Sequence, residues 1–206
     1  MVLAMTRNVE TKRLLANGVG VRLSLVNISM ALWVLFFTLR LFLVSEIILF
    51  VVLALSVSIF GTMLLYRPRE RSVSVIEYLF IHMPVVMTIV VLFQADVWQN
   101  GLLALGWYYH TGTGNGKWER DHAVHTWGAF GIVLGTSVVN AILTFSFADV
   151  AWCVASIYVS ASLALVSRGK PPQVFIPIIL GAVLVFVALL SSFGMSFFSV
   201  SKNKEK

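Results

Sequence analysis

Long apolar runs constrain this chain more than any other feature. Ile47 to Tyr66 contains no charged residue, and similar runs recur as far as Val200. A helix needs roughly 20 mostly apolar residues to cross a bilayer, and its backbone polar groups must be paired within the hydrocarbon. With 59% apolar and 12% charged residues, 206 residues could not hide this surface in one soluble core. The sequence therefore predicts an all-α polytopic transmembrane helical bundle.

The first two apolar runs are expected to form a helical hairpin over residues 23–66. The first run extends from Leu23 to Val44, and Arg40 lies close enough to its end for the side chain to reach the headgroups. Ser45 and Glu46 then provide a very short polar connection to the second run. Such a short connection predicts two antiparallel neighbours.

The third run extends from Val73 to Trp98 and is followed by a short apolar piece, Gly101 to Tyr109. That piece is too short to cross the membrane comfortably, and its aromatic end is typical of the membrane interface. Residues 73–109 therefore predict a third span plus an interfacial or re-entrant segment. A tilted crossing by the short piece, which would give seven spans instead of six, remains open.

The second half is expected to form a three-helix unit over residues 125–200, entered from a polar loop at 110–124. Small residues recur on its first two helices at spacings that let helix backbones approach closely in lipid. Gly131 and Gly135, for example, form a GxxxG pair. The predicted packing residues are Gly128, Gly131, Gly135, Ala151, Ala155, Ser156 and Ser160.

Charge allows two topologies. Six spans leave the polar N-terminal segment (1–22) and the basic tail (201–206) in the cytosol with an arginine-rich loop, whereas seven spans put the tail outside. Lys202 and Lys204 lie fifth and third from the end, and they resemble the dilysine retrieval signal of endoplasmic reticulum membrane proteins. Because that signal is read from the cytosol, it favours six spans and a location in the endoplasmic reticulum.

Part of the second half resembles a group of known sequences. The matching stretches are WGAFGIVLGTSVVN, DVAWCVASIYVSASL and PPQVFIPIIL, which lie between Trp127 and Gly181. They resemble the C-terminal half of uncharacterised small multi-pass membrane proteins of fungi. The resemblance implies a eukaryotic membrane location, and no activity or site residue comes with it.

The polar loop and the helix start after it carry three of the four histidines. The candidate residues are His110, Glu119, Asp121, His122 and His125, whose imidazole and carboxylate groups suit zinc or iron. Their spacing does not match an H-E-x-x-H helix, and no cysteine pair accompanies them. Acids at a helix start are also explained by capping and by the macrodipole. We therefore predict a polar helix entry here, with no metal and no cofactor.

Four polar residues of the third run, Glu77, Tyr78, His82 and Asp96, are expected to lie within the membrane. Ionisable groups in spans are costly and usually face the bundle interior or a water-filled cavity. His82 could serve as a proton relay or a solute ligand. The alternative is a buried histidine that is hydrogen-bonded to Tyr78 on its own face or to a neighbouring helix, for instance at Asn140.

Three functions stay open. We favour a non-catalytic accessory or assembly subunit of a secretory-pathway membrane protein complex, because small-residue faces suit partner helices. The first alternative is a membrane enzyme that acts on a lipid or isoprenoid through the 110–125 loop. The second is a small-solute or proton transporter that uses Glu77 and His82.

The net charge of +6 lies mainly at the ends of apolar runs. This position indicates membrane lipids and other membrane subunits as partners, and no nucleic acid.

Overall fold

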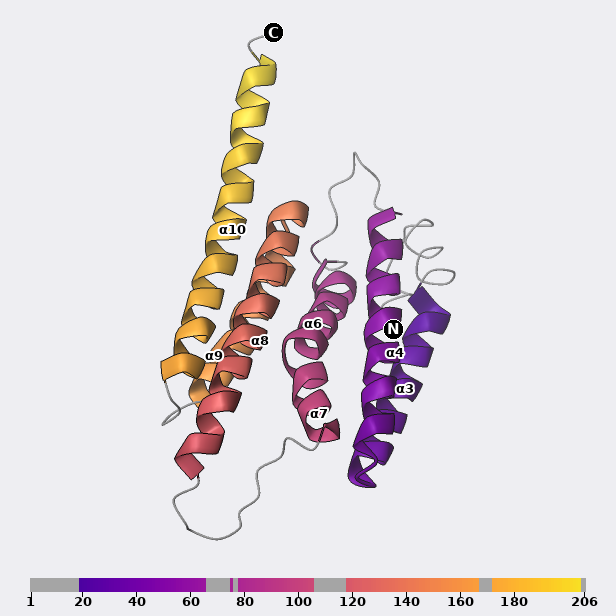
Figure 1. The fold of residues 1–206 in the computed structure, drawn as a ribbon. Coiled ribbons are helices and arrows are strands. Elements are labelled where there is room, and N and C mark those ends of the chain that lie inside the picture. The colour runs from indigo at the N-terminus through magenta and orange to yellow at the C-terminus, as the bar shows by residue number, and fades with distance from the viewer. Residues whose placement is uncertain (1–18, 66–74, 76–77, 106–117, 167–171, 205–206) are drawn as a thin grey trace. The chain divides into compact units, whose positions relative to one another are not determined.

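The computed structural model describes residues 19–65, 75, 78–105, 118–166 and 172–204, with side chains for all of these but 118–126, 166 and 196–204. Every regular element in these ranges is a helix (Figure 1). Five helices are long and apolar enough to cross a membrane by length and composition, and α9 is a shorter apolar helix. The prediction of an all-α membrane protein is confirmed at this level. The chain divides into two compact units, Met1–Tyr108 (unit 1) and Tyr109–Lys206 (unit 2).

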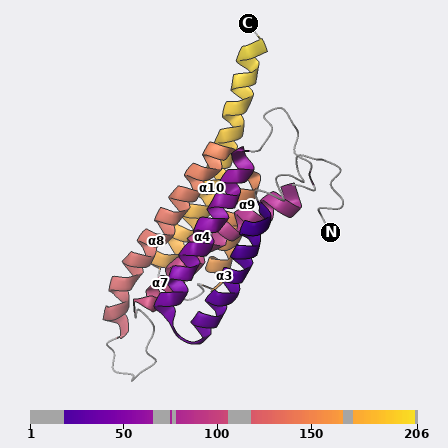
Figure 2. The same ribbon diagram turned by 90° about the vertical axis from the view of Figure 1, so that its right-hand side faces the viewer.

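Unit 1 begins with the predicted hairpin, but its turn lies earlier in the chain. Helices α3 (Gly20–Thr38) and α4 (Phe42–Leu65) pack side by side and are joined by a short turn (Figure 1 and Figure 2). Arg40 lies in this turn with a positive φ of 60°, a conformation that few non-glycine residues adopt. Ser45 and Glu46 are instead buried residues of α4. The prediction that this pair forms the connection is therefore wrong.

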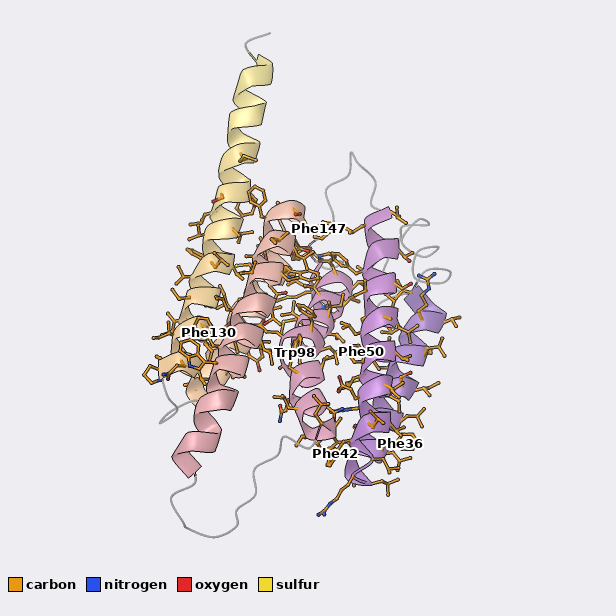
Figure 3. The ribbon with its side chains drawn as sticks, viewed as in Figure 1. Phe36, Phe42, Phe50, Trp98, Phe130 and Phe147 are labelled. Carbon is orange, nitrogen blue, oxygen red and sulfur yellow. The ribbon has the colours of Figure 1, made fainter. Side chains whose placement is uncertain are left out.

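Aromatic rings pack at the turn end of the hairpin. The ring centroids of Trp33 and Phe37 are 5.7 Å apart, and those of Phe37 and Phe42 are 5.5 Å apart in an edge-to-face arrangement. Figure 3 shows Phe36 and Phe42 at this end of the two helices. Such rings suit the membrane interface and fix the angle at which α3 enters the turn.

The third span of unit 1 is one continuous helix in which π-helical and α-helical turns alternate. Its parts are η2 (Tyr78–His82), α6 (Met83–Val91), η3 (Leu92–Asp96) and α7 (Val97–Ala104). Pro84 has no N–H to donate to the preceding turn, and its ring crowds a carbonyl of that turn, so the helix widens to π geometry just before it. Single π turns occur often at functional sites, which directs attention to the polar residues of this span.

The short apolar piece after Trp98 does not form a separate segment. Gly101 to Ala104 continues α7, so the third span extends further than predicted. The prediction of an interfacial or re-entrant segment that begins at Gly101 is therefore wrong. Too few apolar residues remain before the polar loop to supply a seventh crossing. Trp107 to Tyr109 lie outside the described residues.

Unit 2 contains the three helices predicted for residues 125–200. They are α8 (Trp118–Phe147), α9 (Val150–Val166) and α10 (Pro172–Lys204), and each pair of them is in contact (Figure 1). Because α8 begins at Trp118, the last part of the predicted polar loop is the start of a helix. α10 is the longest helix and extends past the end of α8 (Figure 1).

A tight turn reverses the chain between α8 and α9. Ala148 has a positive φ of 49°. Asp149 follows it, and its Oδ1 accepts the backbone N–H of Ala151 at 3.0 Å. This bond satisfies one of the donors that the start of a helix leaves unpaired. Asp149 therefore caps α9, while Ala148 supplies the change of direction.

Candidate functional site

A buried polar cluster joins α4 to α7 in unit 1. The Nδ2 of Asn100 donates to Glu46 Oε2 at 2.8 Å and lies 3.4 Å from the carbonyl oxygen of Phe42. The hydroxyl oxygen of Ser45 lies 3.0 Å from Asn100 Oδ1 and 2.9 Å from the same Phe42 carbonyl. The Glu46 side chain is only 8% exposed. One amide therefore connects the first turns of α4 to the end of the third span.

The surroundings of Glu46 favour a paired, packed carboxylate. Gly101 leaves space beside it, since an added Cβ would come within 3.4 Å of Glu46 Oε1. Glu46 is the fifth residue of α4, and its carboxylate accepts a hydrogen bond from Asn100. A charge in lipid is tolerated when it has such partners. The cluster therefore acts as a polar clamp between two helices.

Arg22 provides a second polar link, between α3 and α4. Its Nη1 donates to Thr62 Oγ1 at 2.5 Å and to the carbonyl oxygen of Ser58 at 3.2 Å. Arg22 is the third residue of α3, so this link lies near the opposite end of the hairpin from Arg40. The two helices of the hairpin are thus tied at both ends.

His82 is buried among aromatic rings near the start of the third span. Its ring stacks on Tyr78, with centroids 5.0 Å apart and planes at 24°, and lies 5.8 Å from the ring of Phe60 on α4. Tyr78 and His82 therefore share one side of the span and pack together. Glu77, the proposed partner of His82 in a proton relay, lies outside the described residues.

Asp96 differs from Glu46, the other acid among the described residues of unit 1. It is the last residue of η3 and is partly exposed. Within the part of the chain that the structure describes, its carboxylate has no hydrogen-bond or ion-pair partner. Glu46, by contrast, is bonded to Asn100. The third span therefore presents one carboxylate that the described residues of its own unit leave unpaired.

Unit 2 has its own buried polar contact between α8 and α9. The indole Nε1–H of Trp152 donates to Asn140 Oδ1 at 3.1 Å, and both residues are almost completely buried. The small residues predicted to pack on α9 are also buried there. They are Ala151, Ala155, Ser156 and Ser160.

The glycines of α8 do not make the close approach between helices. Gly128, Gly131 and Gly135 are exposed, and no atom lies within 4 Å of the position that a Cβ would take on any of them. The close approach is made by Gly181 of α10, where an added Cβ would lie 2.6 Å from the Cβ of Ser137 and overlap its hydroxyl. We refer to the three glycines as the open glycine face of α8.

The predicted residues of the polar loop are placed only in part. His110 lies outside the described residues. Glu119, Asp121, His122 and His125 lie on the helical backbone that begins α8, while their side chains are outside the described part. Among the residues whose side chains are described, no three His, Cys, Asp or Glu residues are grouped so that they could hold a metal ion.

Sequence reasoning missed Asn100, Glu46 and Arg22 as interhelical contacts. For Asn100 one signal was present, because a polar residue four positions after Asp96 lies on the same side of a helix.

Comparisons with known proteins add no relative, since no protein-family model, no curated protein and no solved structure matches the chain. Its function must be argued from its own geometry.

Proposed function

We propose that this protein is a non-catalytic accessory or assembly subunit of a membrane protein complex. The observation that carries the proposal is the open glycine face of α8. In lipid, helices associate through close packing, and small residues at GxxxG spacing let a second backbone approach. The face at Gly131 and Gly135 has the shape that a partner helix requires, and no helix of unit 2 fills it.

The buried polar contacts support this role because they hold helices together. Glu46 is engaged with Asn100 in unit 1, and Asn140 is engaged with Trp152 in unit 2. Interhelical hydrogen bonds of this kind contribute about 1 kcal/mol each in a membrane. These paired side chains hold the helices of each unit together. The outer faces of the helices are then free to bind partner helices.

We place the complex in the endoplasmic reticulum. Lys202 and Lys204 have the spacing of a dilysine retrieval signal, and the backbone at both positions belongs to the last turns of α10. Their side chains lie outside the described part. An even number of crossings brings this tail to the side of the N-terminal segment, where the arginine-rich loop favours the cytosol. The likeness of Trp127 to Gly181 to fungal membrane proteins suits the same eukaryotic setting.

Substitution on the open glycine face tests the proposal. The full-length protein, purified in mild detergent, should carry a stoichiometric partner. The double substitution Gly131→Leu and Gly135→Leu should reduce the amount of bound partner about tenfold, because leucine side chains hold the partner backbone away. Gly61→Leu on α4 is the matched control, since this glycine also has open space at its Cβ position. Purification of the chain alone, or a partner retained by the double variant, would contradict the proposal.

Proton or small-solute transport is the second candidate, and Asp96 is the observation that favours it. An ionisable residue within a span often marks an ion pathway. On this view Glu77 and His82 would continue the pathway towards the other end of the span. Equal proton flux through liposomes that contain wild type or Asp96→Asn would exclude this function.

The third function, a lipid-modifying enzyme that uses the 110–125 loop, stays a prediction, because the described side chains do not include that loop.

A further inference from the structure

Asp96 lies well inside the third span, away from both of its ends. It is eight residues from Ala104, the nearer end of the Tyr78–Ala104 span, which corresponds to about 12 Å along the helix. A bilayer core is about 30 Å thick, so Asp96 lies within the part of the span that crosses it rather than at the end of the helix. Ionisable residues at such depth are rare, and they pair with another group or face a polar cavity.

The spans, as far as the structure describes them, offer no free Lys or Arg to Asp96. The helices α4, α9 and the third span contain no Lys or Arg, and neither do residues 127–147 and 172–195. Arg22 is engaged with Thr62 and Ser58 near the far end of the hairpin, and Arg40 lies in the turn. The described spans of a second copy, with the turn after α3, would bring only the same two arginines. Among the described spans, none therefore carries a free Lys or Arg within the membrane.

We infer that Asp96 binds a basic side chain, Lys or Arg, carried within the membrane by a spanning helix of the partner subunit. This inference rests on the proposed role as a complex subunit and adds the chemistry of the partner. Asp96 is partly exposed, and Gln99 is exposed one turn later on the same side of the helix. A carboxylate and an amide carbonyl at this spacing offer two acceptors to one ammonium or guanidinium group.

Charge complementarity favours a partner helix that carries a Lys or Arg over a purely apolar partner helix. A leucine-rich helix would cover the carboxylate without a donor, which leaves a desolvated polar group unpaired. A helix with one basic residue at matching depth would satisfy both charges at once, since each is costly in lipid alone. The two subunits would then be inserted stably only together.

A synthetic transmembrane peptide provides the test. The probe is a Trp-flanked leucine–alanine helix with one central Arg, and the matched peptide has Leu at that position. Binding of each to the full-length protein in liposomes is measured by energy transfer. The Arg peptide should bind wild type about fivefold more tightly or better. Asp96→Asn should abolish this preference, whereas Asp96→Glu should keep it because the charge is retained.

Glu46→Gln is the control for a general effect of removing an acid, because Glu46 is already paired with Asn100. It should leave the preference for the Arg peptide unchanged. Equal binding of both peptides to wild type, or a preference that survives in Asp96→Asn, would overturn the inference. A native partner that co-purifies equally with wild type and Asp96→Asn would also overturn it, while the subunit role would stand. A chain that prefers the Arg peptide yet purifies alone supports the Asp96 site and removes the subunit role.

Discussion

At Asn100 a single side-chain amide forms hydrogen bonds that link α7 to α4. Its NH₂ group can donate twice and its oxygen can accept, and the structure provides Glu46, Phe42 and Ser45 as partners. Glu46 in turn depends on this amide, because an unpaired buried carboxylate costs far more than a neutral side chain. The pair should therefore behave as one energetic unit.

Replacing Asn100 by Leu should lower the free energy of unfolding by about 1–3 kcal/mol, because the buried Glu46 side chain loses its hydrogen-bond donor. Thermal unfolding in mild detergent, followed by circular dichroism, measures the effect. Asn27→Leu makes the same change at an exposed position of α3 and should leave the midpoint unchanged. Adding Glu46→Leu to Asn100→Leu should recover much of the loss, since no buried charge remains. Equal midpoints for Asn100→Leu and wild type would show that the clamp contributes nothing.

Sequence patterns could not reveal this clamp. Ser45 and Glu46 are two adjacent polar residues between apolar runs, and that pattern is typical of a loop. Their partner is Asn100, more than fifty positions away, and a pairing across that distance leaves no periodic trace in either helix. Arg40, the actual turn residue, was expected to end a span by extending towards the headgroups. The local pattern therefore predicted a connection in the right region, and the tertiary contact decided its position.

At the scale of helices, α8 and α10 approach each other most closely where a glycine faces a small side chain. Gly181 of α10 is buried against Ser137 of α8, whose hydroxyl donates to the carbonyl oxygen of Val133 in its own helix at 2.7 Å. That internal bond satisfies the hydroxyl without using space between the helices. Because serine is short and held in this way, it cannot move aside for a larger neighbour.

Gly181→Ala should destabilise unit 2 by about 1–3 kcal/mol, because the added methyl group would force α8 and α10 apart. Gly194→Ala on the same helix is the control, since no atom lies within 4 Å of its Cβ position. That change should leave stability unchanged or raise it slightly, as alanine is the better helix former. Combining Gly181→Ala with Ser137→Gly should restore part of the lost stability. A Gly181→Ala protein that unfolds at the wild-type midpoint would show that the helices pack loosely here.

The extent of each helix was largely predictable, while the choice of packing face was not. Run length and hydropathy predicted the spans because the bilayer sets the length that a crossing helix needs. The GxxxG pattern predicted that α8 has a face suited to close packing. It could not show that Ser137, on another face, meets Gly181, because periodicity records the composition of a face and not its neighbour. The boundary of the third span was missed because Trp98 and the residues after it look interfacial, although the helix continues to Ala104.

For the whole molecule, the number of helices fixes the relation between the two ends. Unit 1 supplies three spans and unit 2 supplies α8, α9 and α10. α9 has 17 residues, which is near the lower limit of about 17–25 for a crossing helix. With α9 as a sixth crossing, the N-terminal segment, the arginine-rich loop and the lysine tail would lie on one side. The polar loop that contains His110 would then lie on the other side.

A glycosylation reporter tests this topology and the proposed location together. A cassette with an Asn-x-Thr acceptor, inserted between Gly112 and Thr113, should be glycosylated, because six crossings place that loop in the lumen. The same cassette inserted after Arg69 should stay unmodified, since that loop is expected in the cytosol.

The Gly112 cassette also tests the proposed location. With the native tail, its glycan should keep the form added in the endoplasmic reticulum. Lys202→Ser together with Lys204→Ser should allow processing in the Golgi, because a cytosolic retrieval signal is lost. An unmodified Gly112 cassette would contradict the six-span topology, and a glycan that the tail substitutions leave unchanged would remove the retrieval signal while the topology stands.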